Sequence, residues 1–227
     1  MKRKKITKKV RVAIEKRCNN FCECCGIDIV TDKHHILELS QGGPDTIENL
    51  IALCPSCHRQ IPKYLDASQQ KKLQEWNTVS KHSVTHNIRT NLNCFKIGSN
   101  TYIDNKSILK INGQNIFTPV EKDGRYYVNI VMLEGFEPQL LVLTNHLIIG
   151  GDIQINSQND HLKILQGADV IYEIFKENNN TPATINMKFK FKDKLIVATD
   201  DKTQISGMLT LQNSTFRSND TALNLNF

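Results

Sequence analysis

Two pairs of cysteines in the first quarter of the chain have the spacing of metal ligands. Cys22 and Cys25 are separated by two residues, and so are Cys54 and Cys57. A Cys-x2-Cys turn places both sulfurs on one side of a tight loop, and two such turns complete a tetrahedral set of four thiolates. Zn2+ suits such a site because it has no redox chemistry and favours soft ligands. The sequence therefore predicts a structural zinc site, with Cys24 inside the first pair as an alternative ligand.

Residues that could carry out hydrolysis lie between the two cysteine pairs and directly after the second pair. They are His34, His35, Asn49 and His58. An imidazole with a pKa near 6.5 can accept a proton from water at neutral pH, and a neutral imidazole also binds divalent metals. This part of the chain is longer than the connection of about 15–20 residues in a plain zinc ribbon. We therefore expect the inserted residues to carry the chemistry.

These residues follow one another in the order of a known family. The run His34-His35-Ile36, then Leu39, Gly42-Gly43, Asp45, Asn49-Leu50 and Leu53-Cys54-x-x-Cys57-His58, resembles the HNH endonucleases in their four-cysteine, McrA-like form. The resemblance covers about residues 10–80 and implies a ββα-metal fold. In that fold a first strand carries the two adjacent histidines, a glycine loop leads to a second strand, and a helix opens around Pro55.

The resemblance also implies a role for each polar residue. His34 and His58 would bind one divalent cation, Mg2+ or Mn2+. His35 would be the general base, and Asn49 would hold the loop of His35 in position. The expected reaction is hydrolysis of a phosphodiester, in which a metal polarises the phosphoryl oxygen and a base deprotonates water.

Two positions depart from the family pattern. Glu38 stands where members often have proline, and it either alters the loop or adds a carboxylate near the metal. Pro62 stands where colicin-type relatives supply a further histidine, one helical turn after His58. The metal would then have two histidine ligands and several waters, which suits Mg2+ or Mn2+.

The positive charge is confined to the N-terminal part. Residues 1–90 hold 16 Lys and Arg against 9 Asp and Glu, whereas residues 91–227 hold 13 against 14. Such asymmetry points to a polyanionic partner for the first segment. Lys8, Lys9 and Arg11 would contact phosphates, and Arg59, beside the expected metal, would grip the strand to be cleaved. A solvated basic face is the alternative interpretation.

Composition excludes several classes of protein. Of the 227 residues, 39% are hydrophobic and 23% are charged, which suits a packed core and not a disordered chain. No apolar run approaches the roughly 18 residues of a membrane span. No apolar stretch follows the basic start of the chain, so we expect no secretory signal. Clustered cysteines then indicate metal ligands in a reducing compartment, and we expect a cytoplasmic protein.

The pattern predicts an α+β organisation. We expect a basic helix at 1–17, the zinc-stabilised ββα-metal module with a following helix at 18–80, a linker at 81–93 and an all-β domain at 94–227. Alternating or β-branched runs between Asn- and Gly-rich turns predict strands at Ile108–Ile111, Tyr126–Met132, Leu140–Ile149, Val170–Phe175, Ile185–Phe191 and Met208–Leu211. Their spacing favours an antiparallel sandwich or an irregular solenoid.

Two hypotheses of function follow. The first is a metal-dependent endonuclease that cleaves DNA, in restriction or anti-phage defence, with the β-domain for specificity or control. The second is a catalytically inactive, zinc-stabilised module that binds nucleic acid and whose β-domain carries the main function. The sequence does not separate DNA from RNA as the substrate. It also leaves open a homo-oligomer or a regulatory partner that binds through the β-domain.

Overall fold

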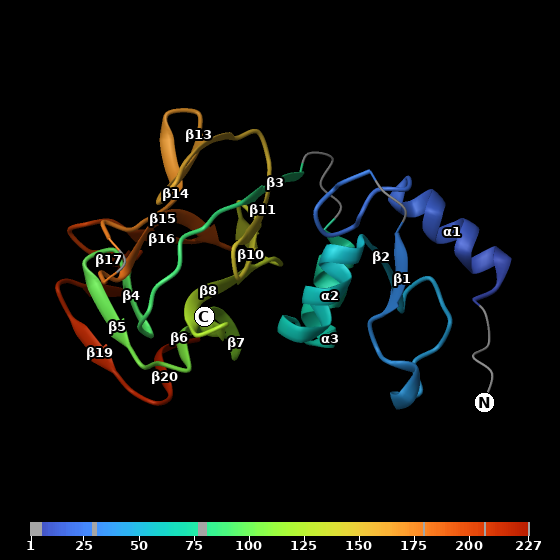
Figure 1. Ribbon diagram of the computed structural model, residues 1–227, viewed down its shortest axis with the longest axis horizontal. Coiled ribbons are helices and arrows are strands. Elements are labelled where there is room, and N and C mark those ends of the chain that lie inside the picture. Colours follow the sequence, from blue (N-terminus) through green and yellow to red (C-terminus); the bar gives the residue numbers. More distant parts are fainter. Residues whose placement is uncertain (1–5, 29–30, 77–80, 179, 207, 227) are drawn as a thin grey trace. The chain divides into compact units, whose positions relative to one another are not determined.

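The chain folds into two compact units that divide within one strand (Figure 1). In the computed structural model, residues 6–28, 31–76, 81–178, 180–206 and 208–226 are described. The units are Met1–Ser83 and Val84–Phe227. Parts of three expected segments lie outside the described residues: 1–5 of the basic helix, 29–30 and 77–80 of the module, and 179, 207 and 227 of the β-domain. The first unit contains the helices, and the second consists almost entirely of strands.

In the N-terminal unit an antiparallel hairpin lies between one helix and a pair of helices (Figure 1). The elements are α1 (Lys8–Cys18), β1 (Asp32–His35), the 3-10 turn η1 (Leu39–Gln41), β2 (Leu50–Leu53), α2 (Pro55–Tyr64) and α3 (Ala67–Glu75). All four residues of β2 are buried, because α1 packs on β2 from one side and α2 from the other. Ile14 of α1 forms a small core with Leu50 and Ala52. The hairpin is therefore held from both faces.

The ends of the helices follow from local sequence. Cys54 caps α2, with Pro55 at the first turn where its missing N–H is not needed. Leu65 is the C-cap of α2, and Asp66 is the N-cap of α3, where it forms a capping box in which its side chain and that of Gln69 bond each other's backbone. The corner between α2 and α3 is therefore tightly defined.

The C-terminal unit contains two sheets, described here over the ranges given above. The first has the strand order β20-β6-β7-β8-β10-β11-β3. Its strands are β3 (Lys81–Thr85), β6 (Ser107–Ile111), β7 (Gln114–Lys122), β8 (Arg125–Met132), β10 (Leu140–Leu143), β11 (His146–Gly150) and β20 (Thr221–Leu225). Neighbouring strands pair antiparallel from β6 to β11, whereas β20 joins β6 in parallel.

The second sheet runs in sequence order from β12 to β18, with short strands attached to it. Its main strands are β12 (Gln154–Gln158), β13 (His161–Gln166), β14 (Asp169–Phe175), β15 (Ala183–Phe191), β16 (Lys194–Ala198), β17 (Thr203–Ile205) and β18 (Leu209–Leu211). The attached strands are β4 (Cys94–Ile97), β5 (Asn100–Ile103), β9 (Phe136–Glu137) and β19 (Thr215–Arg217). β4 pairs with β15 in parallel, and β19 does so with β5.

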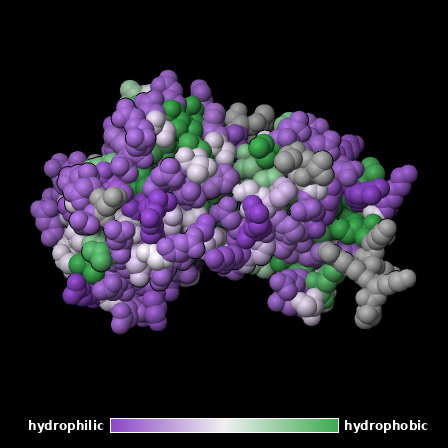
Figure 2. Space-filling view, viewed as in Figure 1, coloured by the Kyte–Doolittle hydropathy of each residue, from purple (hydrophilic) through white to green (hydrophobic). Residues whose placement is uncertain are grey.

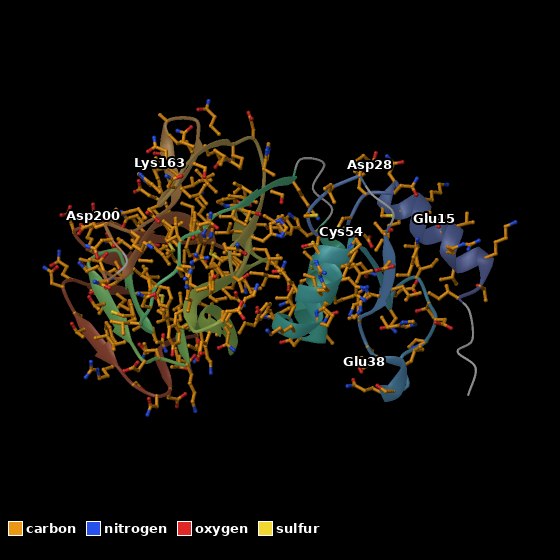
Figure 3. All side chains as sticks on the ribbon, in the orientation of Figure 1. Glu15, Asp28, Glu38, Cys54, Lys163 and Asp200 are labelled. Atoms are coloured by element: carbon orange, nitrogen blue, oxygen red, sulfur yellow. The ribbon has the colours of Figure 1, made fainter. Side chains whose placement is uncertain are left out.

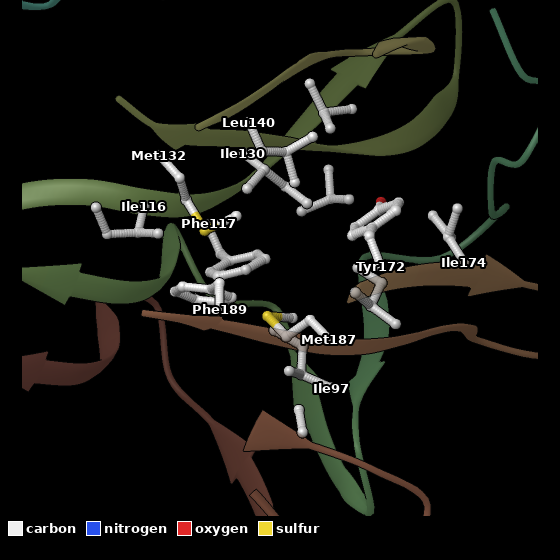
Figure 4. Packing of buried hydrophobic residues seen from close by; sticks show 14 of the residues in the cluster. Ile97, Ile116, Phe117, Ile130, Met132, Leu140, Tyr172, Ile174, Met187 and Phe189 are labelled. Carbon is white, nitrogen blue, oxygen red and sulfur yellow. The ribbon is translucent and has the colours of Figure 1, made fainter. Parts of the chain in front are cut away.

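Residues from both sheets share one hydrophobic core (Figure 4). Phe117 and Ile130 contribute from the first sheet, and Tyr172, Met187 and Phe189 from the second. Most strand pairs of the second unit are antiparallel. The core shared by the two sheets is the packing of a sandwich. The expected α+β class, a module with clustered cysteines followed by a β-rich region, is confirmed.

Large hydrophobic side chains are exposed only in scattered positions of the described chain. Figure 2 shows a mainly hydrophilic face on which hydrophobic residues gather in small separate patches. The exposed large hydrophobic residues are Val12, Phe21, Ile27, Leu37, Leu39, Leu92 and Met208. None of the described helices is long and apolar enough to cross a membrane.

Two segments differ from the sequence expectation. The segment 81–93, expected as a linker, begins with β3, and its Ile88 is buried in the core of the second unit. The run Leu140–Ile149, expected as one strand, forms the hairpin of β10 and β11. Thr144 turns the chain with a φ of 55°, and its N–H donates to Asn129 Oδ1 at 2.6 Å. The buried side chain of Asn129 thus stabilises a turn between β10 and β11 that the apolar sequence gave no reason to expect.

A buried histidine gives the second unit a pH dependence. Burial lowers the pKa of His86 to about 4, and its Nδ1 accepts the Ile88 N–H at 3.2 Å. Between pH 6.5 and pH 4, His86 becomes protonated in the unfolded chain but stays neutral in the folded protein. The free energy of unfolding therefore falls as the pH falls. We expect this residue to lower the free energy of unfolding by about 3 kcal/mol across that range.

The variant His86→Gln keeps an acceptor but does not titrate. Urea unfolding of the full-length variant, followed by circular dichroism at pH 7 and pH 4, should show a smaller difference between the two pH values than the wild type does. The same loss of stability in both proteins would contradict this role for His86.

Candidate active site and cysteine cluster

Four thiols of the N-terminal unit converge, two from the segment before β1 and two from the start of α2. The sulfur atoms of Cys22, Cys25, Cys54 and Cys57 lie within 4.8 Å of one another, and all four residues are buried. The Sγ atoms of Cys25 and Cys54 are 3.9 Å apart. Sulfurs around a tetrahedral Zn2+, with Zn–S bonds of about 2.3 Å, would be separated by about 3.8 Å. The cluster is therefore compatible with a structural zinc ion.

Backbone and thiol donors surround these sulfurs. The Cys54 N–H donates to Cys22 Sγ at 3.3 Å, and the Cys57 N–H donates to Cys54 Sγ at 3.4 Å. Hydrogen bonds from the thiols of Cys25 and Cys57 lower the pKa of Cys22 to about 2. Donors that favour a thiolate are what a metal-binding sulfur needs.

The remaining cysteines of the unit stand outside the cluster. Cys24 is fully buried but is not among the four converging sulfurs. Cys18 lies at the end of α1, where burial raises the pKa of its thiol. The geometry therefore favours the pair Cys22 and Cys25 over any pair that includes Cys24.

The structure brings two of the candidate metal ligands together. His34 on β1 and His58 on α2 have ring centroids 5.0 Å apart in an edge-on arrangement. Burial lowers the pKa of His34, and the charge of His58 lowers it further. A neutral imidazole is the form that binds a metal ion. These residues are thus suited to hold one divalent cation between the strand and the helix.

His35 lies on the opposite face of β1, as strand alternation predicts. Its side chain is 7% exposed, and its Nε2 is 2.7 Å from Asp45 Oδ1. A carboxylate only accepts hydrogen bonds, so the neutral His35 ring carries its proton on Nε2 and a lone pair on Nδ1. A histidine paired in this way can accept a proton at Nδ1, and the resulting imidazolium is stabilised by the carboxylate.

Asn49 ties together the loop between β1 and β2. Its Nδ2 donates to Leu37 O at 3.0 Å and to Pro44 O at 2.9 Å, and its Oδ1 accepts the Leu37 N–H at 2.8 Å. Gly43 is required in this loop, because a Cβ there would lie 1.9 Å from Leu37 O. The amide therefore fixes the segment that leads from His35 to Asp45.

The two departures from the family pattern have clear local consequences. Glu38 is exposed in the loop after β1, where Figure 3 labels it, and its carboxylate accepts a bond from Ser40 Oγ at 2.9 Å. Pro62 lies inside α2, one turn after His58, and offers no ligand atom. Glu38 thus supports the η1 turn, and His34 and His58 remain the two candidate imidazole ligands.

A match to a known family agrees with this arrangement. Residues 22–63 match the family model for HNH endonuclease. This segment is an HNH domain. It contains all four clustered cysteines, the three histidines and Asn49. The helices α1 and α3 extend beyond it on either side.

Two curated proteins share similarity with part of the chain. The type IV methyl-directed restriction enzyme EcoKMcrA of Escherichia coli (strain K12) is 36% identical over 61 residues, which are 23% of this chain and 22% of that enzyme. Anaredoxin of a Nostoc species is 38% identical over 40 residues, which are 18% of this chain and 53% of anaredoxin. The chain therefore spans about a fifth of the first relative and about half of the second.

Two further polar residues, one in the HNH domain and one in α3 after it, contact the histidine pair, and sequence reasoning gave neither a role. Asp32 Oδ2 lies 3.1 Å from His58 Nδ1, and Gln70 Oε1 lies 3.1 Å from His34 Nε2. Asp32 had a signal in the sequence, since it stands two residues before His34 on the same face of a strand. Gln70 had none, because only the packing of α3 brings it to the hairpin.

The predicted phosphate contacts are exposed cations of the N-terminal unit. Lys8, Lys9 and Arg11 lie on the outer face of α1, and Arg59 follows His58 on α2. Thr7 caps the first turn of α1 through a bond from Val10 N. Arg59 is therefore adjacent in sequence to the histidine pair, whereas the α1 cations belong to a separate helix.

A partly buried ion pair joins α1 to the HNH domain, with 27% of the Arg17 side chain exposed. Both carboxylate oxygens of Glu23 accept from the Arg17 guanidinium at 2.7 Å, and Glu23 is 9% exposed. Arg17 also donates to the carbonyls of Ile47 and Leu50, and Glu23 accepts the Ala52 N–H. The variant Arg17→Met leaves Glu23 charged and without its ion-pair partner, so we expect a loss of about 1–3 kcal/mol in the free energy of unfolding.

Urea unfolding monitored by Trp76 fluorescence measures this loss, since Trp76 is the only tryptophan and is buried in the same unit. The double variant Arg17→Met/Glu23→Gln should recover a large part of the lost stability, because it removes the unpaired charge. A single variant as stable as the wild type would show that the pair does not secure α1.

Proposed function

We propose that the protein is a metal-dependent HNH endonuclease that hydrolyses DNA phosphodiester bonds. The observation that carries the proposal is the joint placement of three histidines in the HNH domain. The rings of His34 and His58 are 5.0 Å apart, and His35 on the other face of the same strand is paired with Asp45. Two neighbouring imidazoles that can hold a metal ion, together with a third imidazole oriented by a carboxylate, can carry out metal-assisted hydrolysis.

In this proposal each residue has one task. His34 and His58 hold Mg2+ or Mn2+, which when bound supplies charge neutralisation at the phosphate and at the leaving 3′-oxygen. His35 accepts the proton of the attacking water at Nδ1, and Asp45 stabilises the charged ring. Asn49 keeps the loop between them in place.

The substrate is proposed from charge. Arg59 beside the histidine pair would grip the scissile strand, and Lys8, Lys9 and Arg11 would contact neighbouring phosphates without reading sequence. By analogy with the family, the products would carry 5′-phosphate and 3′-hydroxyl ends. A zinc ion on the four cysteines would hold the hairpin and α2 together in a reducing, cytoplasmic compartment.

The biological setting is proposed from the relative that is a restriction enzyme. We place the protein in restriction or anti-phage defence, with the C-terminal β-domain for specificity, control or self-association. Its charge of 13 basic against 14 acidic residues after position 90 does not favour a main role in holding phosphates.

The test is direct incubation of the full-length, zinc-loaded protein with supercoiled plasmid, and separately with RNA, in Mg2+ or Mn2+. We expect plasmid to be nicked or linearised with either metal and to stay intact when EDTA is added just before the substrate. Cleavage of RNA alone would assign the substrate differently. No cleavage in any metal would favour the alternative, a zinc-stabilised binding module without activity.

A further inference from the structure

In His34 and His58, one ring nitrogen of each residue is already hydrogen-bonded to another side chain. His58 Nδ1 lies 3.1 Å from Asp32 Oδ2. Because an ionised carboxylate can only accept, the neutral His58 ring carries its proton on Nδ1. The lone pair of His58 is therefore on Nε2, the nitrogen away from Asp32.

His34 has the opposite arrangement. Its Nε2 lies 3.1 Å from Gln70 Oε1, while Gln70 Nε2 donates to the carbonyl of Leu65 at 2.9 Å. That second bond fixes the orientation of the amide, since the reversed amide would place its oxygen against the Leu65 oxygen. His34 thus donates from Nε2 and carries its lone pair on Nδ1.

Gln70 is held rigidly in this position. It is 5% exposed and lies in the first turn of α3, directly after the capping box of Asp66 and Gln69. Its other partner, Leu65, is the C-cap of α2. The corner between α2 and α3 therefore presents a fixed acceptor to His34, and α3 lies outside the matched segment 22–63.

We infer that Asp32 and Gln70 are positioning residues that give the two metal-binding histidines opposite tautomers, so that His34 ligates through Nδ1 and His58 through Nε2. This inference rests on the proposed function, in which the pair holds a divalent cation. Partners of this kind fix both the tautomer and the ring orientation of a ligating histidine. Their removal typically weakens metal binding by about 10- to 100-fold.

Asp32 could instead bind the metal itself, because its side chain is 58% exposed beside His58. The two roles predict different spectra. An orienting Asp32 determines the tautomer of His58 before any metal is added. A ligating Asp32 contributes to affinity and leaves that tautomer unchanged when it is removed.

The experiment uses full-length protein with the cysteine cluster filled by zinc and with 15N-labelled histidine. Long-range 1H–15N correlation spectra are recorded before and after one further equivalent of Zn2+, which serves as a diamagnetic probe. We expect the Nδ1–H form of His58 and the Nε2–H form of His34 before addition. After addition the signals of His34 Nδ1 and His58 Nε2 should shift to the metal-bound range.

Three variants test the positioning roles. Asp32→Leu should convert His58 to the Nε2–H form and weaken binding of the added Zn2+ by about 10- to 100-fold, whereas Asp32→Asn, which keeps an acceptor, should preserve the tautomer. Gln70→Leu should weaken Zn2+ binding to a similar degree. Gln74→Leu is the matched control, because the partners of that α3 amide among the described residues are Lys71 and the backbone carbonyls of Ile47 and Leu50, and not the histidine pair.

Several results would overturn the inference. Ligation shifts on the opposite nitrogens would refute the tautomer assignment. Weaker Zn2+ binding by Asp32→Leu with an unchanged His58 tautomer would make Asp32 a ligand, and equal effects of Gln70→Leu and Gln74→Leu would make Gln70 structural. A wild-type protein that takes up no further Zn2+ would refute the ligand assignment. The predicted spectra in a protein that never cleaves DNA would refute only the proposed reaction.

Discussion

The variant His35→Ala is expected to lower the rate of plasmid cleavage by about 10²- to 10⁴-fold, the contribution of a positioned general base. The reason is the pairing of His35 Nε2 with Asp45 Oδ1 at 2.7 Å, which leaves Nδ1 to accept the proton of water. Alanine removes this acceptor and leaves the cysteine cluster and the pair of His34 and His58 in place. The measurement is the initial rate of nicking of supercoiled plasmid in Mg2+ and in Mn2+.

His161→Ala is the matched control for this experiment. That histidine belongs to β13 of the other unit and bonds Glu173 at 2.7 Å, so its loss should leave cleavage unchanged. If His35→Ala cleaves as fast as the wild type and the control, the activity arises elsewhere or from a contaminant, and the role of His35 is wrong.

Removal of zinc is expected to unfold the HNH domain and to leave the β-domain folded. The four sulfurs join the loop before β1 to the start of α2, where Figure 3 labels Cys54, and the hairpin between them is short. Structural zinc sites contribute about 10–16 kcal/mol at neutral pH, which is comparable to the whole stability of a small domain. The second unit has its own core of residues from both sheets, and the four clustered cysteines contribute nothing to it.

Two signals separate the units in this experiment. Trp76, the only tryptophan, lies in the first unit, so a red shift of its emission after strong chelation reports unfolding there. The strand signal in circular dichroism reports mainly on the second unit. The variant Cys94→Ser, which alters a thiol outside the cluster, should behave as the wild type does. Unchanged Trp76 emission, or melting of both units together, would contradict the prediction.

Local spacing explains why the cysteine cluster and the positions of the candidate histidines were predictable from sequence. Both cysteine pairs are turns of four residues, and their convergence follows from the chemistry of a tetrahedral ion. His34 and His35 had to lie on opposite faces of β1, and Pro55 marked the start of α2. Each of these features depends on neighbours within a few residues, which the sequence displays directly.

The rest of the site depends on tertiary packing. Gln70 reaches His34 only because α3 folds back from the corner at Leu65. Glu23 has the composition of an ordinary surface residue, yet it is buried by Arg17 and the backbone of β2. Neither role leaves a periodicity in the sequence, so pattern reasoning passes over both residues.

The sequence predicted that the C-terminal domain consists of strands, but not the order in which these strands pair. Alternation predicted several of its strands, but the parallel pairs join segments far apart in sequence, such as β4 with β15 and β20 with β6. Short polar strands such as β3 have a composition typical of a linker. The register and the partner of each strand depend on side-chain packing in the core that the two sheets share. The sequence of a single strand does not reveal them.

The proposed function depends on His34 of β1 and His58 of α2 forming one site for a divalent cation. Calorimetric titration of the full-length, zinc-loaded protein with Mn2+ tests this site. We expect one Mn2+ per chain, binding weakened at least about tenfold by His34→Ala or His58→Ala, and binding retained by His35→Ala and His161→Ala. Unchanged Mn2+ binding after loss of both His34 and His58 would contradict it.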